Sequence, residues 1–157
     1  MTQLLAGIVV VGDTTTVVYA EVPDDIEEPI TIIADDNWKL QTGARGPALV
    51  VQHQRVINFF QEHTVNLAIV KGSASAQGRA SLALLESAEA RGVVIAAASS
   101  VTKVEILTKA RISKSYGDRK VDAYLKDDTF WDGHVTGQKL RKASREAAML
   151  IIASRER

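Results

Sequence analysis

The stretch VNLAIVKGSASAQGRASLALLESAEARGVVIAAA, residues 65–98, joins two apolar runs through a glycine-rich loop and a helical pattern. Residues 66–70, NLAIV, form a short continuous apolar run, typical of a strand buried on both faces. The segment RASLALLESAEARG predicts a helix ending at Gly92, because glycine often terminates helices. Residues 93–98, VVIAAA, then predict another strand. Apolar strands joined by a helix indicate a parallel sheet covered on both faces.

Upstream of this unit, the sequence predicts an antiparallel three-stranded meander. Two β-rich runs, Leu4–Val11 and Thr15–Val22, flank Gly12 and Asp13. Both turn residues tolerate positive φ, so a tight hairpin is expected between the runs. A third short strand is predicted over about Ile30–Ala34.

Helical periodicity accounts for most of the remaining chain. Pro47 suits the first turn of a helix that runs to His63. Further helices are predicted over Ser99–Lys109, near Asp118–Asp127, and over Gly137–Ser154. The chain therefore predicts one α/β domain, residues 1–157. Its five-stranded mixed sheet has three antiparallel strands followed by two parallel strands, flanked by helices that include a long C-terminal one.

Composition narrows the classes of function. The 157 residues are 46% hydrophobic, and 19 basic residues balance 19 acidic ones, so nucleic-acid binding requires a local basic patch. There is no cysteine, which excludes disulfides and thiolate zinc sites and is compatible with a reducing compartment. No apolar stretch approaches the length of a membrane span, and the start has no basic segment before its apolar run. We therefore expect a cytoplasmic protein with no membrane partner.

Three antiparallel strands, helix, strand, helix, strand and C-terminal helix is the element order of the RNase H-like fold. The segments LLAGIVVVGDTTTVVYAEV, residues 65–98 and SREAAMLIIAS resemble the corresponding parts of RuvC-type resolvases and of small bacterial proteins of RuvC-like type. The resemblance spans most of the chain. It lies in element order and apolar pattern, which say more about fold than about function.

The resemblance implies particular positions at which metal-binding carboxylates should occur. RuvC-type nucleases hold two divalent cations with acids in the first strand, at the end of the fourth strand and in the last helix, since hard cations require converging carboxylates. Here those positions fall at about Val9, at Val70 or Lys71, and at Glu146, with Ala143 one turn earlier. One carboxylate beside a lysine is unsuited to two cations. We therefore expect that the standard nuclease centre, and with it any cofactor, is absent.

Other acids are weak candidates for a relocated metal site. Asp13 is expected to form the hairpin turn, and Asp35 and Asp36 are expected to lie in a solvated turn. Asp118 suits a helix N-cap. Only a relocated site of this kind, including Asp13 or Glu146, would require Mg²⁺.

The loop after residue 70 is a candidate anion site. Gly72 and Ser73 follow a predicted parallel strand, with Lys71 and Arg79 on either side, so exposed amides and two cations would favour phosphate. A plain connection is the alternative. The predicted last helix carries a second basic group, which contains Lys139, Lys142 and Arg145. Nearby Tyr124, Phe130 and Trp131 either stack on bases or pack a short helix on the sheet.

Three hypotheses of function follow. The first is a catalytically degenerate RuvC-like or RNase H-like protein that acts as a binding or assembly module. It would contact DNA or RNA through the local basic patch and pair as a homodimer. The second is a metal-dependent nuclease with relocated acids, and the third is a protein-interaction subunit with no nucleic-acid role.

Overall fold

The structure is a computed structural model that describes residues 2–74, 81–115 and 119–155. Its sheet has the order β5-β4-β1-β2-β3-β6. The strands are β1 (Gln3–Val11), β2 (Thr14–Val22), β3 (Ile30–Lys39), β4 (Leu67–Lys71), β5 (Lys103–Leu107) and β6 (Val135–Gly137). The helices are α1 (Arg45–Glu62), α2 (Leu82–Ser99), α3 (Lys109–Ser115), α4 (Val121–Leu125), α5 (Asp128–His134), the 3-10 helix η1 (Lys142–Ser144) and α6 (Arg145–Arg155).

The strand directions confirm the predicted α/β sheet. β1 pairs antiparallel with β2 and β2 with β3, whereas β4 lies parallel to β1 and β5 parallel to β4. Gly12 adopts a φ of 60° at the first hairpin, as the turn prediction required. A sixth strand, β6, pairs parallel with the start of β3 and was not predicted, because three residues give too short a pattern.

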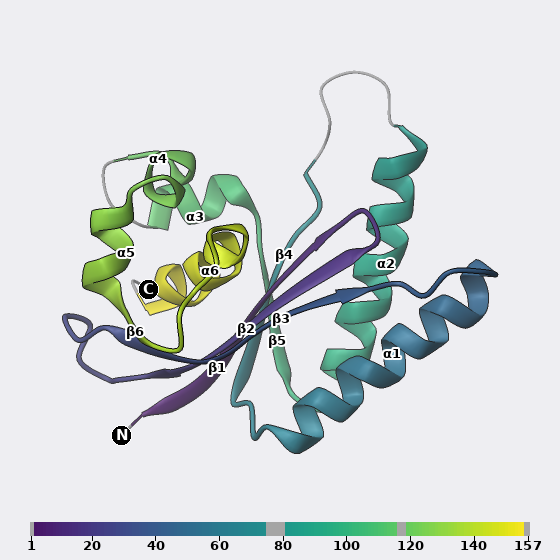
Figure 1. Ribbon diagram of the computed structural model, residues 1–157, viewed down its shortest axis with the longest axis horizontal. Helices are drawn as coiled ribbons and strands as arrows, with labels where there is room; N and C mark the ends of the chain where they lie inside the picture. The colour runs from purple at the N-terminus through teal and green to yellow at the C-terminus, as the bar shows by residue number, and fades with distance from the viewer. Residues whose placement is uncertain (1, 75–80, 116–118, 156–157) are drawn as a thin grey trace.

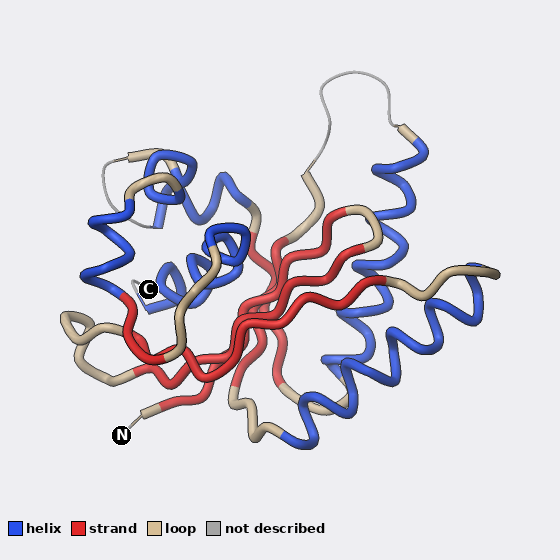
Figure 2. Tube along the Cα trace, in the orientation of Figure 1, coloured by secondary structure: helices blue, strands red, loops and turns tan. Residues whose placement is uncertain are grey.

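Helices cover both faces of the sheet (Figure 1). α1 and α2 lie on one face, where Ile8, Val17 and Val70 belong to one apolar core. α3 to α6 lie on the other face, where Val18 and Ile69 pack with α6 in a second core. Eight of the eleven residues of α6 are buried, because this helix lies between the sheet and the short helices α3 and α4 (Figure 2). In the part of the chain that is described, no helix is long and apolar enough to span a membrane.

The predicted strand at residues 93–98 is wrong. These residues continue α2, which does not end at Gly92 (Figure 2). Only Val94, Ala97 and Ala98 are buried there, at the spacing of one helix face. The strand that was expected here is β5, which lies inside the predicted helix over Ser99–Lys109. Its sequence KVEIL alternates charged and apolar residues, as suits an edge strand.

The predicted helix over Gly137–Ser154 is also partly wrong. Its first residue ends β6 instead, and only η1 and α6 are helical. Gly137 has a φ of 87°, and a Cβ at this position would lie 2.6 Å from the Ile32 carbonyl oxygen. The close contact between β6 and β3 therefore requires glycine at this position. Because Gly137 belongs to β6, the helix that was predicted to begin there cannot form.

Candidate nucleic-acid interface

The carboxyl ends of β1 and β4 meet the start of α6. In the parallel pair, Ile8 lies beside Val70, so the next residues, Val9 and Lys71, follow at the same edge. Val9 is buried in the core on the α6 side. Lys71 extends to the same side and forms an ion pair with Glu146, in the first turn of α6. The three positions that the resemblance singles out therefore converge in the fold.

This arrangement does not fit two divalent cations. The Lys71 and Glu146 side chains are 24% and 30% exposed, so their opposite charges are partly shielded from water. The ammonium already neutralises the carboxylate, and a dication placed between them would meet strong repulsion. Across the described ranges, no three histidine, cysteine or acidic side chains gather closely enough to bind a metal. Asp13 lies in an exposed turn, where its side chain accepts a hydrogen bond from Thr14.

More lysines surround the Lys71–Glu146 pair than the sequence indicated. A hydrogen bond from Lys109 is the largest cause of the lowered pKa of Asp122, and the charges of Lys126 and Lys71 add to it. The pKa of Asp128 is lowered first by a hydrogen bond from Arg145 and then by the charge of Lys142, which lies one turn before Glu146. The exposed Lys126 and Lys142 form no ion pair within the described residues. We call Lys71, Lys109, Lys126 and Lys142 the basic rim.

Lys109 and Lys126 were missed by the sequence analysis. Lys109 begins α3 and Lys126 follows the last residue of α4, and these helices have only seven and five residues, too few to show a clear period. Only the fold brings them to the edge at which β4 ends.

The predicted anion loop contacts an arginine that the sequence analysis also missed. Ser73 accepts a 2.6 Å hydrogen bond from Arg91 of α2, which also donates to the carbonyl of Val10. Lys71 and Ser73 line the same cavity, of about 430 Å³, together with Arg91. Arg79 lies outside the described residues. The loop thus has two cations near it, but both already have partners in the fold.

The second predicted basic group, on the last helix, has members at the surface and in the core. Lys139 is exposed, whereas the Arg145 side chain is only 10% exposed. The Arg145 guanidinium donates to Asp128 and to the carbonyl of Leu125, and it lies 5.9 Å from the Trp131 ring centre. Lys139 and Arg145 both line a cavity of about 280 Å³. Arg145 therefore connects α6 to α5, whereas the exposed Lys139 forms no ion pair with any described residue and can contact a ligand.

The aromatic trio packs inside the protein. Tyr124, Phe130 and Trp131 are 6%, 8% and 4% exposed. The Trp131 indole nitrogen donates to the carbonyl of Tyr124. Their burial supports the packing interpretation and leaves no ring face for a base.

The predicted solvated turn at Asp35 and Asp36 is wrong. Both residues belong to β3, and the Asp35 side chain is only 2% exposed. Its carboxylate accepts hydrogen bonds from Arg141, at 2.6 Å, and from the Ser144 hydroxyl. These contacts join β3 to the residues that precede α6, 106 positions later. They therefore help to position Glu146.

The Asp35 contacts predict acid sensitivity. Burial raises the pKa of the Asp35 carboxyl, but hydrogen bonds from Arg141 and Ser144 outweigh it, so the net pKa lies below its usual value. A lowered native pKa adds stability above the unfolded pKa, about 4, and this stability is lost as pH falls further. We expect the free energy of unfolding, measured with urea, to decrease from pH 5 to pH 3. Asp35→Asn should weaken this dependence, and an unchanged slope would contradict it.

The chain resembles known proteins in structure but not in sequence. No family model matches the chain, and no curated protein matches its sequence. Among solved structures, Thermus thermophilus RuvC aligns with a TM-score of 0.74 at 11% identity, covering 96% of this chain and 92% of that one. The fold is RuvC-like.

Two further structures agree with this RuvC-like fold. Thermus thermophilus RuvC in complex with Holliday junction substrate gives a TM-score of 0.72 at 12% identity, with 96% and 91% of the chains covered. The yeast mitochondrial Holliday junction resolvase gives 0.68 at 6% identity, with 98% and 79% covered. Identities this low establish the RuvC-like fold alone, so function has to come from the site.

Proposed function

We propose that this RuvC-like protein binds nucleic acid without cutting it by the two-cation reaction. The ion pair between Lys71 and Glu146 carries the proposal, because an ammonium lies where the resemblance implies a metal ligand. Val9 adds no oxygen ligand beside it. The fold is then used as a binding or assembly module, and the zero cysteine count suits the cytoplasm, where we place it.

The basic rim supports the binding part of the proposal. Lys126 and Lys142 are exposed and can contact phosphates without breaking an ion pair in the fold. The exposed Lys139, with Arg79 from the sequence prediction, would extend the contact. Lys71 and Arg145 would act indirectly, by holding α6 and its neighbours in place. Because this contact is mainly electrostatic, its affinity should fall steeply with salt.

Charge reversal tests the nucleic-acid contact. We expect Lys126→Glu and Lys142→Glu each to weaken binding of a four-way DNA junction by about tenfold at low salt, and to reduce the salt slope by about one. Fluorescence anisotropy with a labelled junction measures both. Lys103→Glu is the matched control, because Lys103 is exposed at the opposite end of the parallel strands.

Three results would refute this contact. They are no binding by the wild type at low salt, equal affinity for the two rim variants and the wild type, or the same loss for Lys103→Glu. A duplex and a single strand of equal length, used beside the junction, identify the preferred nucleic acid. The proposal also includes pairing of two chains as a homodimer.

A further inference from the structure

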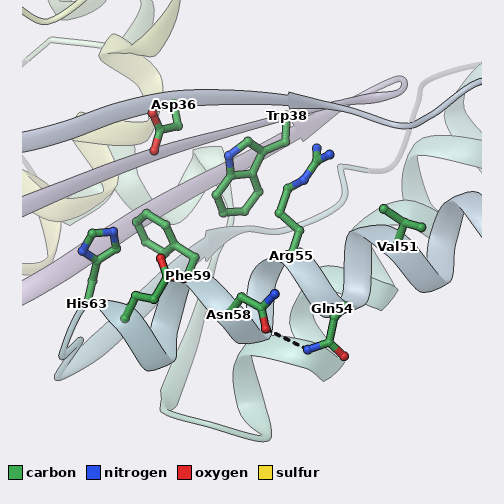
Figure 3. A pocket seen from close by; sticks show the side chains of 9 residues that line it. Asp36, Trp38, Val51, Gln54, Arg55, Asn58, Phe59 and His63 are labelled. Carbon is green, nitrogen blue, oxygen red and sulfur yellow. Dashed lines mark hydrogen bonds between the residues drawn. The ribbon is translucent and has the colours of Figure 1, made fainter.

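A groove runs between β3 and α1, on the face of the sheet opposite α6 (Figure 3). It encloses about 610 Å³. Trp38, Phe59 and His63 form its aromatic part, with 5.3 Å between the Trp38 and Phe59 ring centres and 4.4 Å between those of Phe59 and His63. Val51, 39% exposed, adds apolar surface. This mixed lining is typical of surfaces that bind another molecule.

Opposite charges lie at different positions along the groove. Arg55 belongs to the middle of α1, whereas Glu62 ends the helix, seven residues later. Two helical turns separate them, about 10 Å along the axis. Asp36 of β3 lines the groove too, and Figure 3 shows it at the end near His63. The groove thus has a positive part and a negative part.

None of these three charged side chains forms an ion pair within the described residues, although the charge of Asp36, after the contacts of Asp35, helps to raise the pKa of Arg141. Arg55 donates only to the carbonyl of Lys39, at 3.4 Å, and neither Asp36 nor Glu62 makes an ion pair. Asn58 lies midway between Arg55 and Glu62, and accepts a hydrogen bond from Gln54. A polyanion such as nucleic acid would be repelled by the two carboxylates.

A surface with separated positive and negative parts complements itself under a two-fold rotation. If two α1 helices lie antiparallel with Asn58 near the axis, Arg55 of one chain faces Glu62 of the partner subunit, and the reverse pair forms as well. Trp38, whose ring packs against Phe59 close to that axis, would then be covered from water. We propose that this groove is the interface through which two copies of the chain pair. The proposal rests on the homodimer in the proposed function and names its surface.

Pairing through α1 would leave the nucleic-acid contact free. α1 covers one face of the sheet, whereas Lys142 and the Lys71–Glu146 pair belong to the other. One dimer would therefore present two basic rims. Once one rim has bound a branched or long nucleic acid, the effective concentration of the second rim is high, so overall binding is stronger.

Sedimentation velocity on charge-exchanged variants tests the interface. The wild type should sediment as a dimer at micromolar concentration. Arg55→Glu and Glu62→Arg should each raise the dissociation constant at least tenfold, because each places like charges opposite one another. The double variant Arg55→Glu/Glu62→Arg should dimerise again, since the exchange restores both pairs. Glu27→Arg, in an exposed turn, is the matched control and should leave the dimer unchanged.

Three outcomes would overturn the proposal. A monomeric wild type, single variants that remain dimeric, or a double variant as monomeric as the single ones would each do so. Junction binding by the same variants separates this proposal from the proposed function. If monomeric variants keep binding that depends on Lys126 and Lys142, the two parts are independent. If only a dimer-preserving variant such as Glu27→Arg binds, the interface is required for function.

Discussion

Lys71→Glu should destabilise the protein by about 2–3 kcal/mol in the presence of EDTA. The substitution replaces the cation that faces Glu146 with a second carboxylate, and both side chains are largely shielded from water. Millimolar Mg²⁺ or Mn²⁺ should restore much of the loss, because two adjacent carboxylates create a site for a hard cation. Urea denaturation, with EDTA and with each metal, measures both effects.

Lys71→Met is the control for this experiment. It removes the cation without adding an acid, so it should cost about 1–2 kcal/mol and show no recovery with metal. If Lys71→Glu is as stable as the wild type in EDTA, the ion pair does not hold β4 and α6 together. If its stability does not respond to Mg²⁺ or Mn²⁺, this edge lacks the geometry of a cation site.

Gly7→Ala should destabilise the protein by about 3 kcal/mol or prevent folding. A Cβ at Gly7 of β1 would lie 2.0 Å from the Ala147 carbonyl oxygen and 2.9 Å from its carbonyl carbon, so α6 would have to move away from the sheet. Ala147 directly follows Glu146. The same displacement would therefore weaken the ion pair with Lys71. Thermal and urea denaturation measure the loss.

Gly92→Ala is the matched control, because it adds the same methyl group to another glycine. Gly92 lies within α2, and no atom of the described residues comes within 4 Å of a Cβ there. Alanine should stabilise the helix by about 0.5–1 kcal/mol. Equal effects at Gly7 and Gly92 would contradict the close contact between β1 and α6.

Local patterns predicted the hairpin and the first helix correctly. Gly12 and Asp13 separate two clear β runs, and α1 has an apolar face long enough to show its period. The pattern fails at VVIAAA, because a short run of small and apolar residues suits a buried strand and a buried helix equally well. The run is helical because it continues α2, a helix that the preceding residues have already begun.

The site was predicted in its parts, and the fold supplied the connections. Val9, Lys71 and Glu146 were each placed from the resemblance, and the structure brings them together as an ion pair beside a buried valine. The partner of Asp35 could not be inferred, because Arg141 lies 106 residues away and nothing local pairs them. Arg145 was expected at the surface, but its partners on α4 and α5 are visible only after those short helices pack.

The groove between β3 and α1 also could not be predicted from local sequence patterns. The sequence placed Trp38 in a connection after the third strand, whereas β3 continues to Lys39 and brings the indole over α1. A strand that carries consecutive aspartates is hard to recognise, because these residues usually favour turns. Arg55 and Glu62 line a groove only because β3 extends far enough to form its other wall.

Binding of Mn²⁺ to the wild-type protein, measured by electron paramagnetic resonance of the free ion, tests the central claim most directly. We predict no site-specific binding at submillimolar Mn²⁺, because the Lys71 ammonium occupies the place of the cation beside Glu146. Lys71→Glu should remove free Mn²⁺ signal under the same conditions. Binding of two Mn²⁺ ions by the wild type, with loss of that binding in Glu146→Gln, would contradict the account.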